Sequence, residues 1–197
     1  KIEVQELIED SEPEPNPDQI PEVTESFQSV SASSEEISFS PGGEVSLDLI
    51  YTTSDEQNEL PGLGLKVHYN SSIFTPSGEN SGVITSFNTL GISTEDDTDD
   101  LDNNSNTDKY LLIIWKDFMG TFPGGDLPAK LANLNFSSSK EGFDSLTGES
   151  KESKINFTSS APAQNYNFLN QSVTLKPHSF NLDVDGNGKV SALGDGL

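Results

Sequence analysis

The chain has 197 residues, of which 33 are Asp or Glu and 10 are basic, and its net charge of −23 argues against a nucleic-acid footprint and against attachment to anionic lipid. The same charge suits a protein that binds cations. There is no cysteine, which excludes disulfides, thiolate metal sites and cysteine nucleophiles. No apolar run approaches the ~20 residues that insert across a bilayer.

Residues 1–34 are rich in Glu, Pro, Ser and Asp, as in the segment Glu12–Pro17. Proline removes backbone donors and like charges repel, so this stretch is predicted to be an extended, disordered linker. The abrupt start and end of the chain lead us to expect a fragment of a longer protein.

From about residue 35 to residue 180 the pattern becomes that of strands. Apolar residues alternate with polar ones, and Gly, Pro, Asn and Ser turns separate the runs. About eight short strands are predicted, around Ile37–Phe39, Val45–Leu49, Leu63–Tyr69, Val83–Phe87, Tyr110–Trp115, Leu131–Phe136, Ile155–Phe157 and Val173–Leu175. The strand at Leu131–Phe136 is expected to be locally irregular.

These features predict an all-β protein, a two-layer antiparallel β-sandwich of jelly-roll type. The run Tyr110–Trp115 is the most apolar and suits a central strand between two layers. Trp115 is expected in the core. Its alternative role is in a sugar-stacking platform with Tyr110, Phe122 and Tyr166.

Residues 181–197 contain the first two-thirds of an EF-hand-type calcium loop. Oxygen-bearing side chains stand at alternate positions, and Gly188 permits the tight turn. The predicted ligands are Asp183, Asp185, Asn187, Lys189 through its carbonyl, and Asp195. The twelfth position is Gly194 and no exit helix follows, so weak binding is expected. The alternative is an Asp/Asn/Gly-rich turn without calcium.

The segment 94–108 carries seven acids and no base. Alternate positions again imitate a calcium loop, with Asp100, Asp102, Asn104, Asn106 and Asp108 as candidate ligands. The alternative is a flexible, solvated loop between two strands.

No constellation indicates an enzyme. The two histidines, His68 and His178, are far apart in sequence, and His68 is expected at the surface because it alternates with core positions. No acid pair stands in an apolar setting and no nucleophile elbow is present. Phe118, Met119 and Phe122 follow the strongest strand and could form an exposed patch for a partner.

Residues 35–74 resemble the opening of a cohesin-like domain. The resemblance is carried by the turn Pro41-Gly42-Gly43-Glu44-Val45 and by the later segment Tyr69-Asn70-Ser71-Ser72-Ile73-Phe74, in which Asn70 replaces the usual aspartate. Residues 182–197 resemble the start of a dockerin-type calcium repeat. These resemblances imply a sandwich whose flat sheet face receives a protein partner outside the cell.

The sequence therefore predicts a non-enzymatic, extracellular calcium-binding module for protein interaction or adhesion, secreted or on a bacterial cell surface. The expected cofactor is Ca²⁺, and the expected partner is a cohesin- or dockerin-type protein, a neighbouring module or a glycan. Two alternatives stay open: a carbohydrate-binding module and an accessory domain of a secreted hydrolase.

Overall fold

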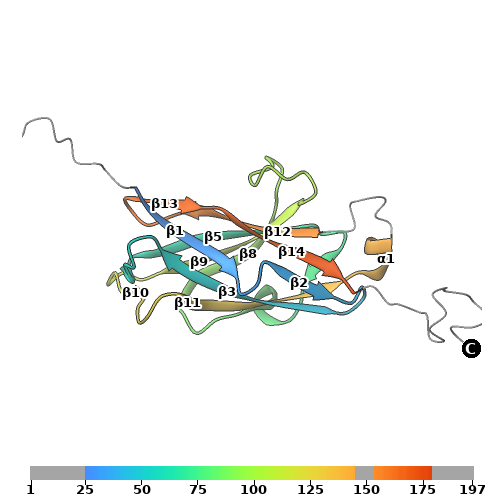
Figure 1. Cartoon of the computed structure of the whole chain (residues 1–197), viewed down its shortest axis with the longest axis horizontal. Coiled ribbons are helices and arrows are strands. Elements are labelled where there is room, and N and C mark those ends of the chain that lie inside the picture. Colours follow the sequence, from blue (N-terminus) through green and yellow to red (C-terminus); the bar gives the residue numbers. More distant parts are fainter. Residues whose placement is uncertain (1–24, 145–152, 179–197) are drawn as a thin grey trace, which may run out of the picture.

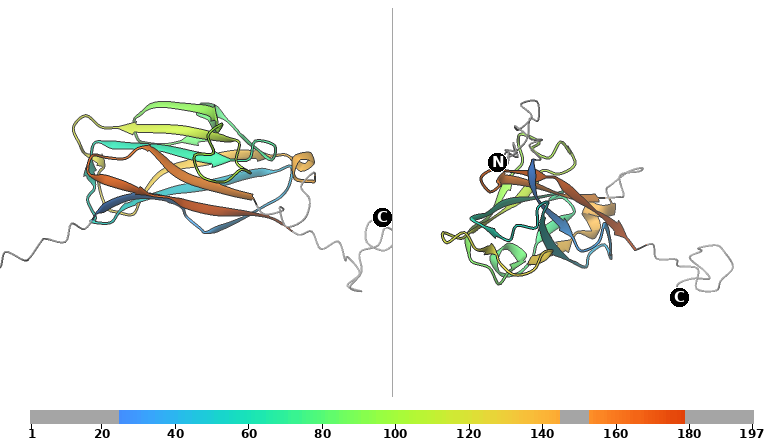
Figure 2. Two further views of the ribbon diagram at one scale, coloured as in Figure 1. Left: turned by 90° about the horizontal axis from the view of Figure 1, so that it is seen from above. Right: turned by 60° about the vertical axis from the view of Figure 1, so that its left-hand side comes forward.

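The computed structural model describes residues 25–144 and 153–178, which form an elongated β-sandwich (Figures 1 and 2). Its strands are β1 (Ser26–Ala32), β2 (Glu36–Phe39), β3 (Glu44–Thr53), β4 (Glu59–Leu60), β5 (Gly62–Tyr69), β6 (Phe74–Pro76), β7 (Val83–Ile84), β8 (Thr89–Asp96), β9 (Lys109–Lys116), β10 (Phe122–Pro123), β11 (Ala129–Ser138), β12 (Ser153–Ala161), β13 (Tyr166–Leu169) and β14 (Gln171–Pro177). A 3-10 turn η1 (Glu79–Gly82) and a short helix α1 (Lys140–Asp144) complete it. Within the described part, no helix is long and apolar enough to cross a membrane.

Two six-stranded sheets make up the layers. The first has the order β13-β1-β3-β11-β6, with β7 also paired to β11, and the second has the order β2-β14-β12-β5-β9-β8. Most pairs are antiparallel, but β1 pairs with β13 and β2 pairs with β14 in parallel. Each sheet thus has one parallel pair at its edge, with β13 and β2 as the edge strands, which is a departure from the purely antiparallel sandwich predicted.

The core lies between the sheets and follows the period-2 alternation of the strands. In β3 the inward residues Val45, Leu47, Leu49 and Tyr51 are buried, and in the opposite sheet Leu111, Ile113 and Trp115 of β9 face them. Trp115 is 1% exposed and stacks on Phe122, so the prediction of a core tryptophan is confirmed. The irregularity predicted near Leu131 is also confirmed, because the register between β11 and β3 shifts between Lys130 and Ala132.

The predicted linker 1–34 is wrong for its last part, because β1 occupies Ser26–Ala32. The sequence gives little signal for this strand, because its fully buried residues are Gln28 and Val30 and the surrounding stretch is rich in serine. The strand predicted over Val83–Phe87 covers only Val83–Ile84. Residues 1–24 and the C-terminal segment 179–197, with its predicted calcium loop, lie outside the described residues.

The strand β9 was predicted to be central and covered on both faces. It is instead next to the edge strand β8. Its inward residues are buried, whereas Leu112 and Ile114 on the outer face are only partly buried. The apolar run Tyr110–Trp115 therefore has two parts: its inward residues belong to the core, and its outward residues Leu112 and Ile114 make the outer face of β9 apolar.

Candidate functional site

The hairpin loop 97–108 joins β8 to β9 and folds back over the outer face of the second sheet; Figure 1 draws it in yellow-green. Its base is closed by a backbone bond from Asp97 N to Asp108 O of 2.9 Å. The Asp108 carboxylate accepts bonds from Ser71 N at 2.7 Å and Ser71 Oγ at 2.6 Å. These contacts attach the loop to the end of β5.

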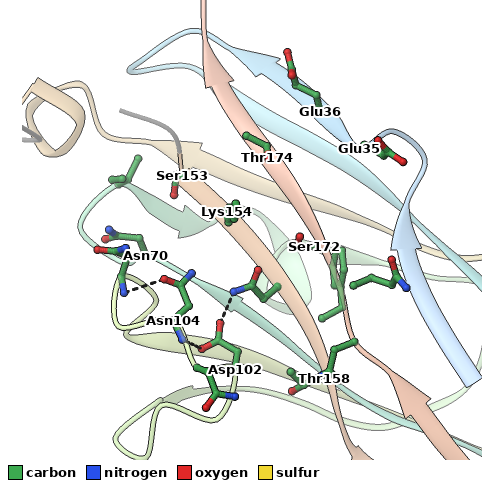
Figure 3. A pocket seen from close by; sticks show the side chains of 17 residues that line it. Glu35, Glu36, Asn70, Asp102, Asn104, Ser153, Lys154, Thr158, Ser172 and Thr174 are labelled. Carbon is green, nitrogen blue, oxygen red and sulfur yellow. Dashed lines mark hydrogen bonds between the residues drawn. The ribbon is translucent and has the colours of Figure 1, made fainter. Parts of the chain in front are cut away.

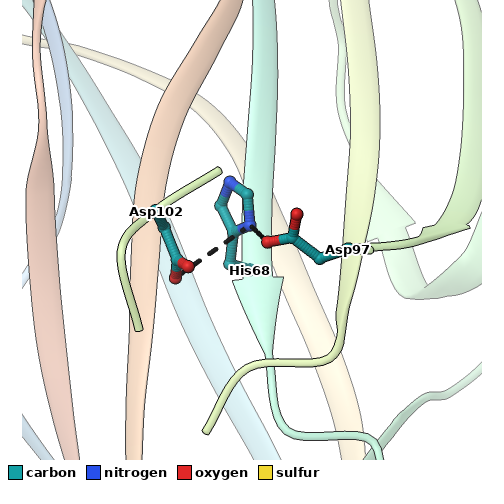
Figure 4. A group of neighbouring side chains, drawn as sticks. All are labelled: His68, Asp97 and Asp102. Atoms are coloured by element: carbon teal, nitrogen blue, oxygen red, sulfur yellow. Dashed lines mark hydrogen bonds and ion pairs between the residues drawn. The ribbon is translucent and has the colours of Figure 1, made fainter. Parts of the chain in front are cut away.

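His68, Asp97 and Asp102 meet beneath this loop (Figure 4). The Nδ1 atom of His68 lies 2.7 Å from Asp97 Oδ2 and 4.0 Å from Asp102 Oδ2. One ligand atom from each side chain fits within a 4.8 Å span, and the three side chains are 0%, 0% and 1% exposed. The cluster joins one residue of β5 to two residues of the loop.

Neighbouring polar groups fix the orientation of each member. His68 Nε2 lies 2.8 Å from Thr158 Oγ1 of β12. Asp102 Oδ2 accepts bonds from Asn156 Nδ2 at 2.7 Å and Thr107 Oγ1 at 2.8 Å. The second oxygen of Asp97 accepts the backbone N–H of Leu101 at 3.1 Å.

An open, mainly polar groove of about 1140 Å³ lies beside the cluster (Figure 3). Asp102 and Thr158 line it, together with Asn104 of the loop and Lys154 of β12. Asp102 of the cluster and its neighbour Thr158 therefore border the groove, although the three cluster side chains are themselves buried.

The prediction that His68 is a surface residue is wrong. The strand alternation does place it on the outer face, opposite Val67 and Tyr69, but the loop covers that face and buries it completely. The signal available in the sequence was an acidic hairpin loop next to strands of the same sheet, which can place carboxylates over a neighbouring histidine.

Of the five predicted ligands in the acidic loop, only Asp102 belongs to the cluster. Asp108 binds Ser71, and Asn104 Oδ1 accepts the backbone N–H of Asn106 at 3.2 Å. Asp100 adopts a left-handed backbone with φ 50°. Calcium binding by this loop stays a prediction. The ligands Asp183, Asp185, Asn187, Lys189 and Asp195 lie outside the described residues.

Hydrogen bonding also sets the electrostatics of the loop. Burial acts to raise the pKa of Asp108, but the two bonds from Ser71, the backbone N–H of Asp108 itself and the charge of Lys109 together hold the pKa below its usual value. The loop is therefore attached through a carboxylate that is ionised at neutral pH.

A second feature is the uncovered part of the same outer sheet face, which we call the β9 face and define by Lys66, Leu112, Ile114 and Lys116. The neighbours of Ile114 across the two adjacent strands are Gly64 and Gly91. Gly91 leaves open space beside Ile114, whereas the Ser160 side chain lies over Gly64, and the strand register shifts next to both glycines.

The opposite outer face differs in chemistry. There, most outward side chains of β3 and β11 are polar, although Ile50 of β3 also lies on this face and is partly buried. Asn133 donates to Ser46 Oγ at 2.9 Å and to Asp48 Oδ1 at 2.8 Å. Exposed apolar side chains are not confined to the second sheet, because Ile84 of β7 and Leu169 of β13, both in the first sheet, are 64% and 51% exposed.

The alternative of a sugar-stacking platform is not formed, because Trp115 and Phe122 are 1% and 4% exposed. The predicted patch of Phe118, Met119 and Phe122 is formed in part. Phe118 and Met119 are 80% and 84% exposed, while Phe122 packs in the core.

Comparison with protein-family models and with curated proteins gives no match. Among solved structures, the chain is similar to a chain of the Coh-OlpC–Doc435 type I cohesin–dockerin complex of Clostridium thermocellum, with a TM-score of 0.47, 14% identity, and coverage of 77% of this chain and 95% of that one. It is also similar to CaCohA2 of Clostridium acetobutylicum, with a TM-score of 0.44, 18% identity, and coverage of 76% of this chain and 91% of that one. A third similar structure is a type III cohesin of the ScaE scaffoldin of Ruminococcus flavefaciens, with a TM-score of 0.43, 11% identity, and coverage of 79% of this chain and 88% of that one. At these scores the similarity says nothing about a ligand or partner.

Proposed function

We propose that the chain is a non-catalytic protein-interaction module that binds its partner through the β9 face. The observation that carries the proposal is the partial exposure of Leu112 and Ile114 on the outer face of the second sheet. Apolar area in contact with water costs free energy. A partner that covers these residues removes that cost.

Charge supports a partner of a particular kind. Lys66 and Lys116 lie on the β9 face in a chain whose net charge is −23, and Glu95 of β8 lies opposite Tyr110 on the same side of the sheet. Lys66 lies 4.8 Å from the centre of the Tyr110 ring, which holds its ammonium over the sheet. The face fits a partner with an apolar patch bordered by carboxylates.

The resemblance of residues 35–74 to cohesin-like domains names the class of partner, a dockerin-type module. We place the chain outside the cell, secreted or on a bacterial surface, and we assign calcium binding to the loop Asp183–Asp195. The calcium loop and the extracellular location rest on the resemblance of residues 182–197 to a dockerin-type repeat and on the acidic, cysteine-free composition.

The test is binding of the full chain to a panel of purified dockerin-type modules by calorimetry. Ile114→Asp is expected to weaken binding at least about 30-fold, since it places a charge in the centre of the interface. The control is Leu169→Asp, because Leu169 is 51% exposed on β13 of the other sheet. Binding that is unaffected by I114D, or no binding across the panel, contradicts the proposal.

A further inference from the structure

We propose that His68, Asp97 and Asp102 form a binding site for a divalent transition-metal ion of the zinc class. The three ligand atoms already face one point within a 4.8 Å span. The site lies beneath the loop 97–108, and its assignment does not depend on the identity of the protein partner.

Charge is the first argument. Within the described residues, both carboxylates form an ion pair only with His68, and no lysine reaches them. A buried carboxylate needs compensation, because the interior solvates charge poorly. An imidazolium supplies one positive charge against two carboxylates, whereas a divalent ion balances both.

The orientation of the imidazole is the second argument. The contact between His68 Nε2 and Thr158 Oγ1 fixes the ring so that Nδ1 faces Asp97 and Asp102. Metal-bound histidines usually donate their other N–H to such a partner. At 2.7 Å, either a hydrogen atom on Nδ1 or a metal ion lies between Nδ1 and Asp97 Oδ2.

The geometry needs only small adjustments to bind a metal. Ligand bonds of ~2.0–2.1 Å in a tetrahedral site place donor atoms about 3.3 Å apart. Asp97 Oδ2 at 2.7 Å from Nδ1 would move outward, and Asp102 Oδ2 at 4.0 Å would move inward. Asp102 also lines the groove, so the ion has a route from solvent and a water molecule can complete the coordination.

The ligand set selects the ion. Calcium and magnesium prefer oxygen ligands alone, whereas one imidazole nitrogen with two carboxylates suits zinc and related transition metals. The proposed site therefore differs in chemistry from the calcium site predicted over residues 100–108, with which it shares only Asp102. A bound ion would fasten the loop to β5.

The direct test observes His68 itself. The variant His178→Gln leaves His68 as the only histidine, and His178 is exposed, so the fold is expected to be kept. In metal-free, ¹⁵N-labelled H178Q, stoichiometric Zn²⁺ is expected to shift the Nδ1 resonance of His68 and to raise the melting temperature, while Ca²⁺ does neither. An unchanged Nδ1 resonance with saturating Zn²⁺ overturns the proposal and leaves a proton-held ion pair.

Variants supply the second test, read by zinc affinity on samples whose circular dichroism matches that of the parent. Thr158→Val keeps the shape of the side chain and removes its contact with Nε2, and it is expected to weaken zinc binding about 10- to 100-fold. Asp97→Asn is expected to weaken zinc binding at least as much. The control Asp100→Asn lies in the same loop outside the cluster and is expected to change nothing. Equal zinc affinity in T158V, D97N and D100N overturns the proposal.

Discussion

At the scale of single residues, the buried side chain of Gln28 connects three segments that are far apart in the sequence. Its side chain donates to Tyr51 Oη at 2.7 Å and to Gly62 O at 3.3 Å, and it accepts the backbone N–H of Ala163 at 2.6 Å. Burial raises the pKa of Tyr51 to about 12 even though the bond from Gln28 opposes the shift. The tyrosine therefore stays neutral inside the core and keeps its hydroxyl hydrogen bond.

Replacing Gln28 by leucine should lower the free energy of unfolding by about 1–3 kcal/mol, because the Ala163 N–H and the Gly62 carbonyl lose a buried partner. Urea denaturation measures the change. The matched control is Gln57→Leu, whose side chain is exposed and whose effect should stay within about 0.5 kcal/mol. Equal effects of the two substitutions would show that the buried network contributes nothing.

The sequence predicts some residues and misses others for a physical reason. Trp115 is predictable because it sits in a strongly apolar run, although its indole N–H also reaches Thr85 Oγ1 at 3.4 Å. Gln28 and His68 are polar, and their burial depends on groups that come from distant parts of the chain: Gly62 and Ala163 for the first, Asp97 and Thr158 for the second.

At the scale of elements, the loop 97–108 contributes Asp97 and Asp102 to the cluster that they form with His68 of the second sheet. Its attachment through Asp108 and Ser71 has a defined pH dependence. Because the pKa of Asp108 is held below its usual value, its contribution to stability is present above the unfolded value of about 3.9 and is lost as pH falls through the folded pKa.

Asp108→Asn should therefore lower the melting temperature at pH 6, and the difference from the parent protein should shrink as the pH falls below about 4. Thermal melts across this range measure it. The control is Asp100→Asn, since Asp100 makes neither bond to Ser71 and its φ of 50° suits asparagine. A difference that is constant with pH would rule out the Asp108 carboxylate as the source.

Strand alternation predicted most of the long strands, because each buries one face in a common core. It did not predict the ends of the sandwich. The parallel pairs β1–β13 and β2–β14 join residues far apart in sequence, and β1 and β13 contain few inward apolar residues. Nor can alternation show that a loop folds onto an outer face, since that depends on contacts such as Asp102 with Asn156.

At the scale of the whole molecule, two separate cation sites of different chemistry are proposed. The C-terminal loop should bind Ca²⁺ weakly, in the range of ~10⁻⁴–10⁻³ M that extracellular modules show. In the full chain, the double variant Asp183→Asn/Asp185→Asn should lose most of this binding, as measured by calorimetry. If the double variant binds Ca²⁺ normally and Asp100→Asn does not, the calcium site is the acidic loop instead.

The central claim is that a partner binds the partly apolar β9 face of the second sheet. The most direct test is a map of amide chemical-shift changes in the ¹⁵N-labelled full chain when a dockerin-type module that binds it is added. The largest changes should fall on Lys66, Leu112 and Ile114, with little change on Ser46 and Asn133 of the opposite face. Changes concentrated on the opposite face, with the β9 face unaffected, would contradict the account.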